Sequence, residues 1–153
     1  MNVEYINPFL KATANVLKTM AFTEANPGKP YLKKEAAAAG DISGVIGITG
    51  ETEGSLSVSF SESCICHIVG NMFGEPVTSI NKEVEDAVGE LTNMISGDAR
   101  RELAEKGIVL KSAIPTVISG KNHTVKHMAN GPAIAIPFET PGGPFLVEVC
   151  FNR

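Results

Sequence analysis

The 153-residue chain carries 13 Lys and Arg against 17 Asp and Glu, which gives a formal net charge of −4. This length predicts one domain, spanning residues 1–153, with a core of ordinary size. No stretch is strongly basic, so nucleic-acid binding is not expected. Aromatic residues make up only 6% and Trp is absent, which argues against a surface that stacks on bases or sugars.

The N-terminus has neither a basic region nor a long apolar core, so we expect no signal peptide. No apolar run approaches the roughly 18 residues of a membrane-spanning helix, so no membrane partner is expected either. The chain has three cysteines, an odd number in a domain too large to need disulfides. They are interpreted as reduced thiols of a cytoplasmic protein.

The first third of the chain predicts one helix and then two strands. Asn7 and Pro8 are expected to open the helix as its N-cap and first residue, and the helix should run to about Ala21. Residues 26–30 form a turn cluster, and Tyr31–Ala39 fits either a strand or a helical turn. Two strands are expected at Asp41–Thr49 and Gly54–Phe60, joined by a polar turn. In the second strand apolar residues alternate with serines, which predicts one face in contact with solvent.

The rest of the chain predicts two helices followed by strands. Ser61 should cap a helix of residues 62–73 that ends at Gly74, and Asn81 should cap a long helix that stops at Gly107. Three strands are expected at residues 108–118, 133–139 and 145–151, with connections at 120–123 and 140–144. Because hairpins dominate, the expected fold is α+β, with a largely antiparallel sheet and helices packed on one side.

The long helix is the segment whose polar residues suggest chemistry. At about 100° per residue, apolar residues fall on one side and Asp86, Glu90, Asn93 and Gly97 on the other. A carboxylate and a carboxamide three residues apart are neighbours on a helix surface. Small residues on this face, Gly89 and Gly97 among them, would let a second molecule approach. Taken alone, however, such a pair is more typical of the solvated face of an ordinary amphipathic helix.

A weak internal repeat relates the first helix to the long one. Residues 12–21 align with residues 90–99, so that Asn15 matches Asn93, and each helix precedes strands. The first copy has Ala12 where the second has Glu90. We therefore expect a duplicated α-β-β unit in which only the second copy holds a complete polar pair.

The run Asp86-x-x-x-Glu90-x-x-Asn93, followed by Pro115, resembles the signature of the CheC/CheX/FliY phosphatases of bacterial chemotaxis. The resemblance extends over the whole chain, although the stretch between Asn93 and Pro115 is one residue shorter than in the family pattern. A single intact pair is similar to CheX, whereas CheC carries two. FliY-like proteins have a longer chain with a further domain, for which there is no room here.

The resemblance implies dephosphorylation of the phosphorylated aspartate on a CheY-like response regulator. A carboxamide can orient a water, so Asn93 would position it in line with the phosphate, and Glu90 would dock against the lysine of the receiver active site. Asp86, Gly89 and Gly97 are the expected further docking contacts. The chain would bind no cofactor of its own, because Mg²⁺ would belong to the receiver. The resemblance also suggests a homodimer joined through sheet edges.

Two other functions remain open at this point. The chain could be a non-catalytic module, related to flagellar switch proteins, that holds a response regulator without hydrolysing its phosphate. It could also be a structural dimer whose long helix is merely solvated. A metal site at Cys64, Cys66 and His67 is not expected, because neighbours on one helix cannot all face one ion. His123 and His127 are equally weak metal candidates.

Overall fold

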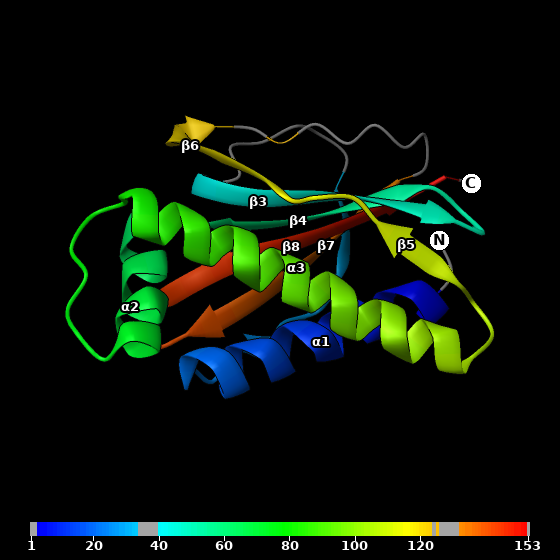
Figure 1. Cartoon of the computed structure of the whole chain (residues 1–153), viewed down its shortest axis with the longest axis horizontal. Helices are drawn as coiled ribbons and strands as arrows, with labels where there is room; N and C mark the ends of the chain where they lie inside the picture. The colour runs from blue at the N-terminus through cyan, green and yellow to red at the C-terminus, as the bar shows by residue number, and fades with distance from the viewer. Residues whose placement is uncertain (1–2, 34–39, 124, 126–131, 153) are drawn as a thin grey trace.

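The computed structural model describes residues 3–33, 40–123, 125 and 132–152. Within them, the chain forms three helices and eight strands: α1 (Val3–Ala21), β1 (Asn26–Pro27), β2 (Tyr31–Lys33), β3 (Gly40–Gly50), β4 (Gly54–Phe60), α2 (Glu62–Phe73), α3 (Lys82–Glu105), β5 (Leu110–Ser112), β6 (Thr116–His123), β7 (Ala133–Thr140) and β8 (Gly143–Phe151). All strand pairs are antiparallel and belong to one sheet, and the helices lie together on one face of it (Figure 1). The predicted α+β class is confirmed.

The sheet repeats one arrangement in its two halves. β4 and β8 pair at the centre, β3 lies outside β4, and β7 lies outside β8. β5 and β6 then pair with β3, as β1 and β2 pair with β7. Along the chain, each repeat is one helix followed by four strands, α1 to β4 and α3 to β8, and its first two strands pair with the third strand of the other repeat. This extends the predicted α-β-β repeat by two strands in each copy.

The first helix begins earlier than its sequence predicts. α1 starts at Val3, and Pro8 lies inside it rather than at its first position. Proline cannot donate a backbone hydrogen bond, so this turn of the helix has one bond fewer. Apolar packing holds the turn nevertheless, because Tyr5 and Phe9 both contact the ring of Phe151, with centroid distances of 5.0 and 6.1 Å.

The cluster at residues 26–30 is more than a turn. Asn26 and Pro27 form β1 against β7, and Gly28 N donates to Pro137 O at 2.7 Å. The ambiguous segment that follows is a strand where it is described, since Tyr31–Lys33 pairs with β7 as β2. β1 and β2 both pair with the edge of β7, which would otherwise have no partner strand on that side. Local sequence does not show that such an edge is available.

The serine face of β4 is not in contact with solvent, so that prediction is wrong. Ser57 and Ser59 are fully buried, and Ser59 Oγ lies 2.7 Å from Ser43 Oγ on β3. The same face carries Glu148 of β8, which pairs with Lys33 Nζ at 3.0 Å. β4 and β8 are the central strands of the sheet, so polar residues there are buried with one another. Alternation of polarity along a strand therefore did not predict exposure here.

The second and third helices follow their predicted ends closely. Ser61 Oγ accepts from Cys64 N at 3.2 Å, and Asn81 Oδ1 accepts from Val84 N at 2.9 Å. Gly74 ends α2 with a φ of 71°, a left-handed conformation that suits glycine. α3 then lies across the sheet, between α1 on one side and the β5–β6 stretch on the other (Figure 1).

The strand predicted at residues 108–118 is two strands. Ser112 pairs with Ile48 and Thr116 with Val45, so three residues of this edge face only two of β3. This is the geometry of a β-bulge, and Pro115 within it has no N–H for the ladder. β6 then continues to His123, through residues expected to form a connection. The predicted connection 140–144 shortens to a two-residue turn between β7 and β8.

Candidate functional site

The centre of α3 presents a carboxylate and a carboxamide from a rigid backbone. Glu90 and Asn93 are exposed, whereas Leu91 and Thr92 between them are at most 1% exposed. Val88 and Ile95 continue the buried stripe on either side. The two polar side chains therefore project from a helix that is fixed on its opposite face, as the periodicity of the sequence predicts.

One contact decides how closely this part of α3 approaches the sheet. Thr92 lies directly over Gly44 of β3, where a Cβ would come within 2.9 Å of Thr92 Cβ and 3.2 Å of Val88 Cγ1. Thr92 Oγ1 itself donates to Val88 O at 2.7 Å, which satisfies the buried hydroxyl within the helix. Gly44 could not be predicted as part of the site, because nothing in a strand pattern indicates which helix residue will cover it.

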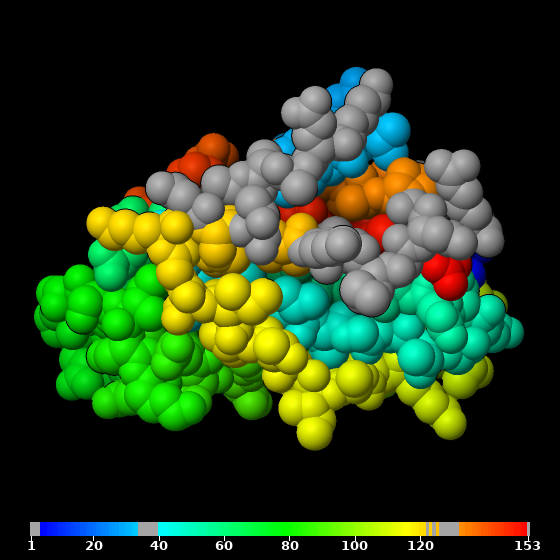
Figure 2. All heavy atoms as spheres, turned by 90° about the horizontal axis from the view of Figure 1, so that it is seen from above, coloured from blue at the N-terminus to red at the C-terminus, as the bar shows by residue number. Residues whose placement is uncertain are grey.

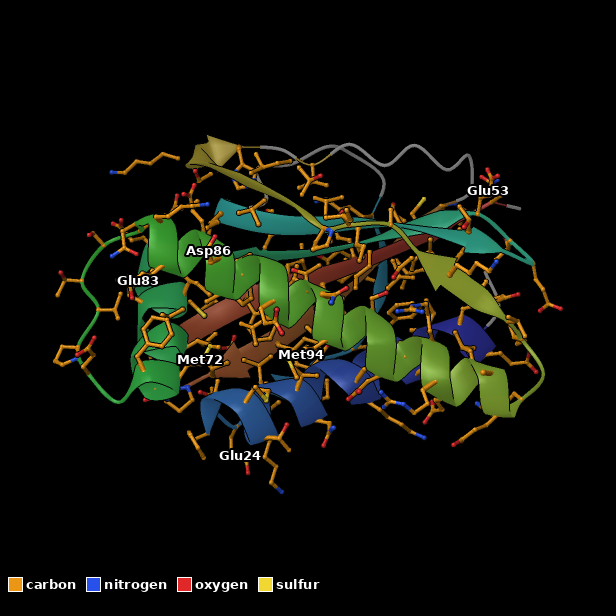
Figure 3. The ribbon with its side chains drawn as sticks, viewed as in Figure 1. Glu24, Glu53, Met72, Glu83, Asp86 and Met94 are labelled. Atoms are coloured by element: carbon orange, nitrogen blue, oxygen red, sulfur yellow. The ribbon has the colours of Figure 1, made fainter. Side chains whose placement is uncertain are left out.

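The two central residues differ from their neighbour Asp86. Within the described part of the chain, neither the Glu90 side chain nor the Asn93 side chain makes a hydrogen bond or ion pair. Asp86 Oδ1 accepts from Lys82 Nζ at 3.1 Å, one turn back on α3, and this bond raises the pKa of Lys82. Both partners of that pair are largely exposed, and Figure 3 labels Asp86 on α3. Glu90 and Asn93 are thus left available to a second molecule.

The two glycines predicted to leave room for a partner have different neighbours. A Cβ at Gly89 would lie 3.4 Å from Val117 Cγ2, so Gly89 lets α3 approach β6. A Cβ at Gly97 would come near only Arg100 Nη2, at 3.9 Å. Of the two, Gly97 opens onto free space and Gly89 faces the fold itself.

The β5–β6 edge runs alongside α3 in the opposite direction. Ser119 Oγ donates to Glu85 Oε2 at 3.1 Å, and Val117 faces Gly89. Four residues of a helix span about 6 Å, and two residues of a strand span about the same length. Because Val117 faces Gly89, moving back two residues to Pro115 corresponds to moving forward four residues to Asn93. Figure 2 shows β6, in yellow, bordering the green surface that α2 and α3 form. Continued by one step, this register therefore places the motif proline at the level of the motif asparagine.

The corresponding asparagine of the first helix has a different environment. Asn15 is exposed, but its Nδ2 donates to Asp98 Oδ2 on α3 at 3.1 Å. Ala12, the counterpart of Glu90, is buried and has no polar group. A groove of about 310 Å³ between α1 and α3 is lined by both residues, together with Lys11 and Glu102 among others. At the positions that match Glu90 and Asn93, α1 therefore has neither an exposed carboxylate nor a free carboxamide.

The cysteines and histidines do not assemble a metal site in the described residues, where no group of three ligating side chains is found. Cys64 is fully buried, and burial raises the pKa of its thiol to about 11. Burial also raises the pKa of Cys66 and of Cys150. His123 Nε2 lies 2.6 Å from Ser43 Oγ, and His127 lies outside the described residues.

The fold, an antiparallel sheet with helices on one face, is that of CheC/CheX/FliY-like structures. The chain belongs to the family described as Chemotaxis phosphatase CheX, whose model matches residues 42–139. Among the described residues, none of the helices has the length and apolar character required to cross a membrane.

Three relatives illustrate the similarity. CheY-P phosphatase CheX of Thermotoga maritima is 29% identical over 127 residues, which are 82% of each chain. A CheC-like superfamily protein from Shewanella sp. PV-4 is 51% identical with full coverage of both chains and a TM-score of 0.94. CheX from Borrelia burgdorferi, in a complex with CheY, BeF₃ and Mg²⁺, is 26% identical over 99% of this chain and 100% of that one, with a TM-score of 0.84.

Proposed function

We propose that this chain accelerates hydrolysis of the aspartyl phosphate on a CheY-like response regulator. The observation that carries the proposal is the exposed pair Glu90 and Asn93, which project from one rigid stretch of α3 without partners in the described chain. Support comes from the family, whose description names a chemotaxis phosphatase, and from the Thermotoga relative named CheY-P phosphatase. The Borrelia relative was solved with CheY.

Asn93 positions the attacking water in this mechanism. Its Oδ1 accepts a hydrogen bond from the water and its Nδ2 can donate to a phosphoryl oxygen, which aligns the water with the phosphorus–oxygen bond that breaks. The water oxygen bonds to phosphorus, the receiver aspartate leaves as a carboxylate, and the water proton passes to the released phosphate. A carboxamide is too weak a base to remove that proton in advance, so Asn93 acts by orientation.

Glu90 anchors the receiver in the same mechanism. An exposed carboxylate can pair with the lysine of a receiver active site through a charge-assisted hydrogen bond. Because Glu90 and Asn93 are three residues apart on one helix, docking of the first fixes the distance at which the second meets the phosphate. Mg²⁺, bound by the receiver, neutralises phosphoryl charge there. Asp86 and Gly97 are further docking contacts on the same helix face.

The experiment mixes the purified chain with a phosphorylated CheY-like receiver and follows the release of inorganic phosphate. We expect release to accelerate with the concentration of the chain and to require Mg²⁺ in the receiver. A decay rate that is the same with and without the chain, across several CheY-like receivers, overturns the proposal. The homodimer stays a prediction, which the molar mass in solution tests directly.

A further inference from the structure

Two large apolar side chains are far more exposed than folding alone would require. Ile114 is 88% exposed and Phe22 is 78% exposed, the highest values among the exposed large apolar residues of the described chain. Single exposed apolar residues are common on protein surfaces. These two, however, lie on opposite sides of the Glu90–Asn93 pair.

Ile114 is held out by the bulge between β5 and β6. The extra residue of this edge displaces the chain from the ladder, and bulges commonly re-aim a side chain. Ile114 also precedes Pro115, which restricts its backbone to an extended conformation. Because Pro115 is level with Asn93, Ile114 borders the site on its β6 side.

Phe22 is held out on the other side, at the end of α1. Lys11 contacts Glu102, and Asn15 contacts Asp98, so α1 and α3 are antiparallel. Each step forward by one residue on α1 therefore corresponds to a step back by one residue on α3. The same register brings Phe22 level with Leu91, between the two site residues.

The backbone at Phe22 is one that glycine would occupy more easily. Its φ is 48°, a left-handed conformation, and Thr23 N, directly after it, donates to Leu17 O at 3.0 Å. A phenylalanine in this left-handed position is unfavourable, and a side chain so exposed gains little packing in return. The stability of the fold therefore gives no reason for an aromatic residue here.

We propose that Ile114 and Phe22 are apolar contacts for the receiver domain, on either side of the row that Glu90 and Asn93 form. This inference rests on the proposed function and names the surface that the partner covers. A stable interface buries about 800 Å² per partner, a disc of roughly 16 Å radius. Elements packed beside α3 lie about 8–10 Å from its axis, well inside a disc centred on Asn93. We therefore infer that a receiver docked on Glu90 with an interface of this size covers both side chains.

The test compares three variants, Ile114→Ser, Phe22→Asn and Val109→Ser. Asn tolerates the left-handed backbone, so Phe22→Asn should fold as the wild type does. Val109 is the matched control, because it is 58% exposed on the same edge but lies about 18 Å further along α3 by the same register. Affinity is measured for a CheY-like receiver loaded with BeF₃⁻ and Mg²⁺, and kcat and KM for its phosphorylated form.

We expect Ile114→Ser and Phe22→Asn each to raise Kd and KM about tenfold, with kcat at saturation unchanged. Val109→Ser should stay within about twofold of the wild type.

If the first two variants bind the receiver as tightly as the wild type, the inference is overturned while stimulated hydrolysis by the wild type still supports the function. If they instead change the chain's own oligomeric state and leave receiver affinity intact, the surface belongs to a second copy and the inference fails. Absence of stimulated hydrolysis in the wild type counts against the function itself, while the binding measurement still decides the surface.

Discussion

Thr92 packs on Gly44 so closely that no other residue fits beneath it: a Cβ at position 44 would lie 2.9 Å from Thr92 Cβ. Thr92 precedes Asn93 directly, so this contact sets the height of the proposed site above the sheet. Gly44 of β3 therefore helps to position the proposed site on α3, although it contacts no substrate.

Gly44→Ala should push α3 outward at its centre. Overpacking of this kind typically costs about 1–3 kcal/mol, and displacement of Asn93 should lower stimulated phosphate release more than it lowers receiver binding. Gly47→Ala is the matched control on the same strand, because a Cβ there meets no atom within 4 Å. Denaturant unfolding and phosphate release measure the two effects. Equal stability of the two variants would contradict the close contact.

Asn93→Ala should abolish stimulated hydrolysis and leave binding largely intact. The loss of water positioning is expected to lower the rate about a hundredfold. Asn15→Ala, in the matching position of α1, removes only a hydrogen bond to Asp98 and should leave the rate unchanged. The rate is followed by phosphate release, and affinity with a BeF₃⁻-loaded receiver. A rate that falls equally in both variants would speak against a special role for Asn93.

Glu90→Gln should weaken docking and lower the rate together. Removal of one charge from the interface should also flatten the dependence of receiver affinity on ionic strength, since the lost pair is electrostatic. Titrations at low and high salt measure this difference. Asp86→Asn is the comparison, because Asp86 is already paired with Lys82 and should have the smaller effect. The role of Glu90 would have to be abandoned if Glu90→Gln kept the wild-type salt dependence.

Ser57→Ala and Ser59→Ala should have different effects on stability, although both residues are buried on the same face of β4. Among the described residues Ser57 Oγ has no hydrogen-bond partner, so its removal should be neutral or stabilising. Ser59 Oγ shares a 2.7 Å hydrogen bond with Ser43, and its loss should cost about 1 kcal/mol. Thermal or denaturant unfolding distinguishes them. A larger loss for Ser57→Ala would contradict this assignment.

The thiol of Cys64 should react slowly in the native chain. Its burial should also make the fold less stable at alkaline pH. Burial keeps it protonated up to a pKa of about 11, above the ordinary value of 9.0. In the unfolded chain the thiol loses its proton near pH 9, so the contribution to stability is complete below pH 9 and falls as pH rises toward 11. Thiol labelling at pH 8, with and without denaturant, and unfolding between pH 8 and 11 test both statements. Cys64→Ala should lose part of the alkaline dependence.

Sequence periodicity was sufficient to predict the elements that carry the site. The apolar stripe and the Asn81 cap of α3 depend on neighbours within four residues, so the helix, its ends and the exposed side of Glu90 and Asn93 were all predictable. The same holds for β3, β4 and α2, each bounded by turn or cap residues. Errors came where local preference was overridden, as at Pro8, where packing against Phe151 extends α1 past a proline.

Sequence alone thus determined the class of fold, the family resemblance and the row of residues proposed to meet the phosphate. Tertiary structure alone decided which residues support that row. Gly44 fits under Thr92 and Val117 faces Gly89, although these partners are about 50 and about 30 positions apart in the printed sequence. Such contacts depend on how strands are ordered and how deep a helix lies, and neither is encoded in the pattern of a single element.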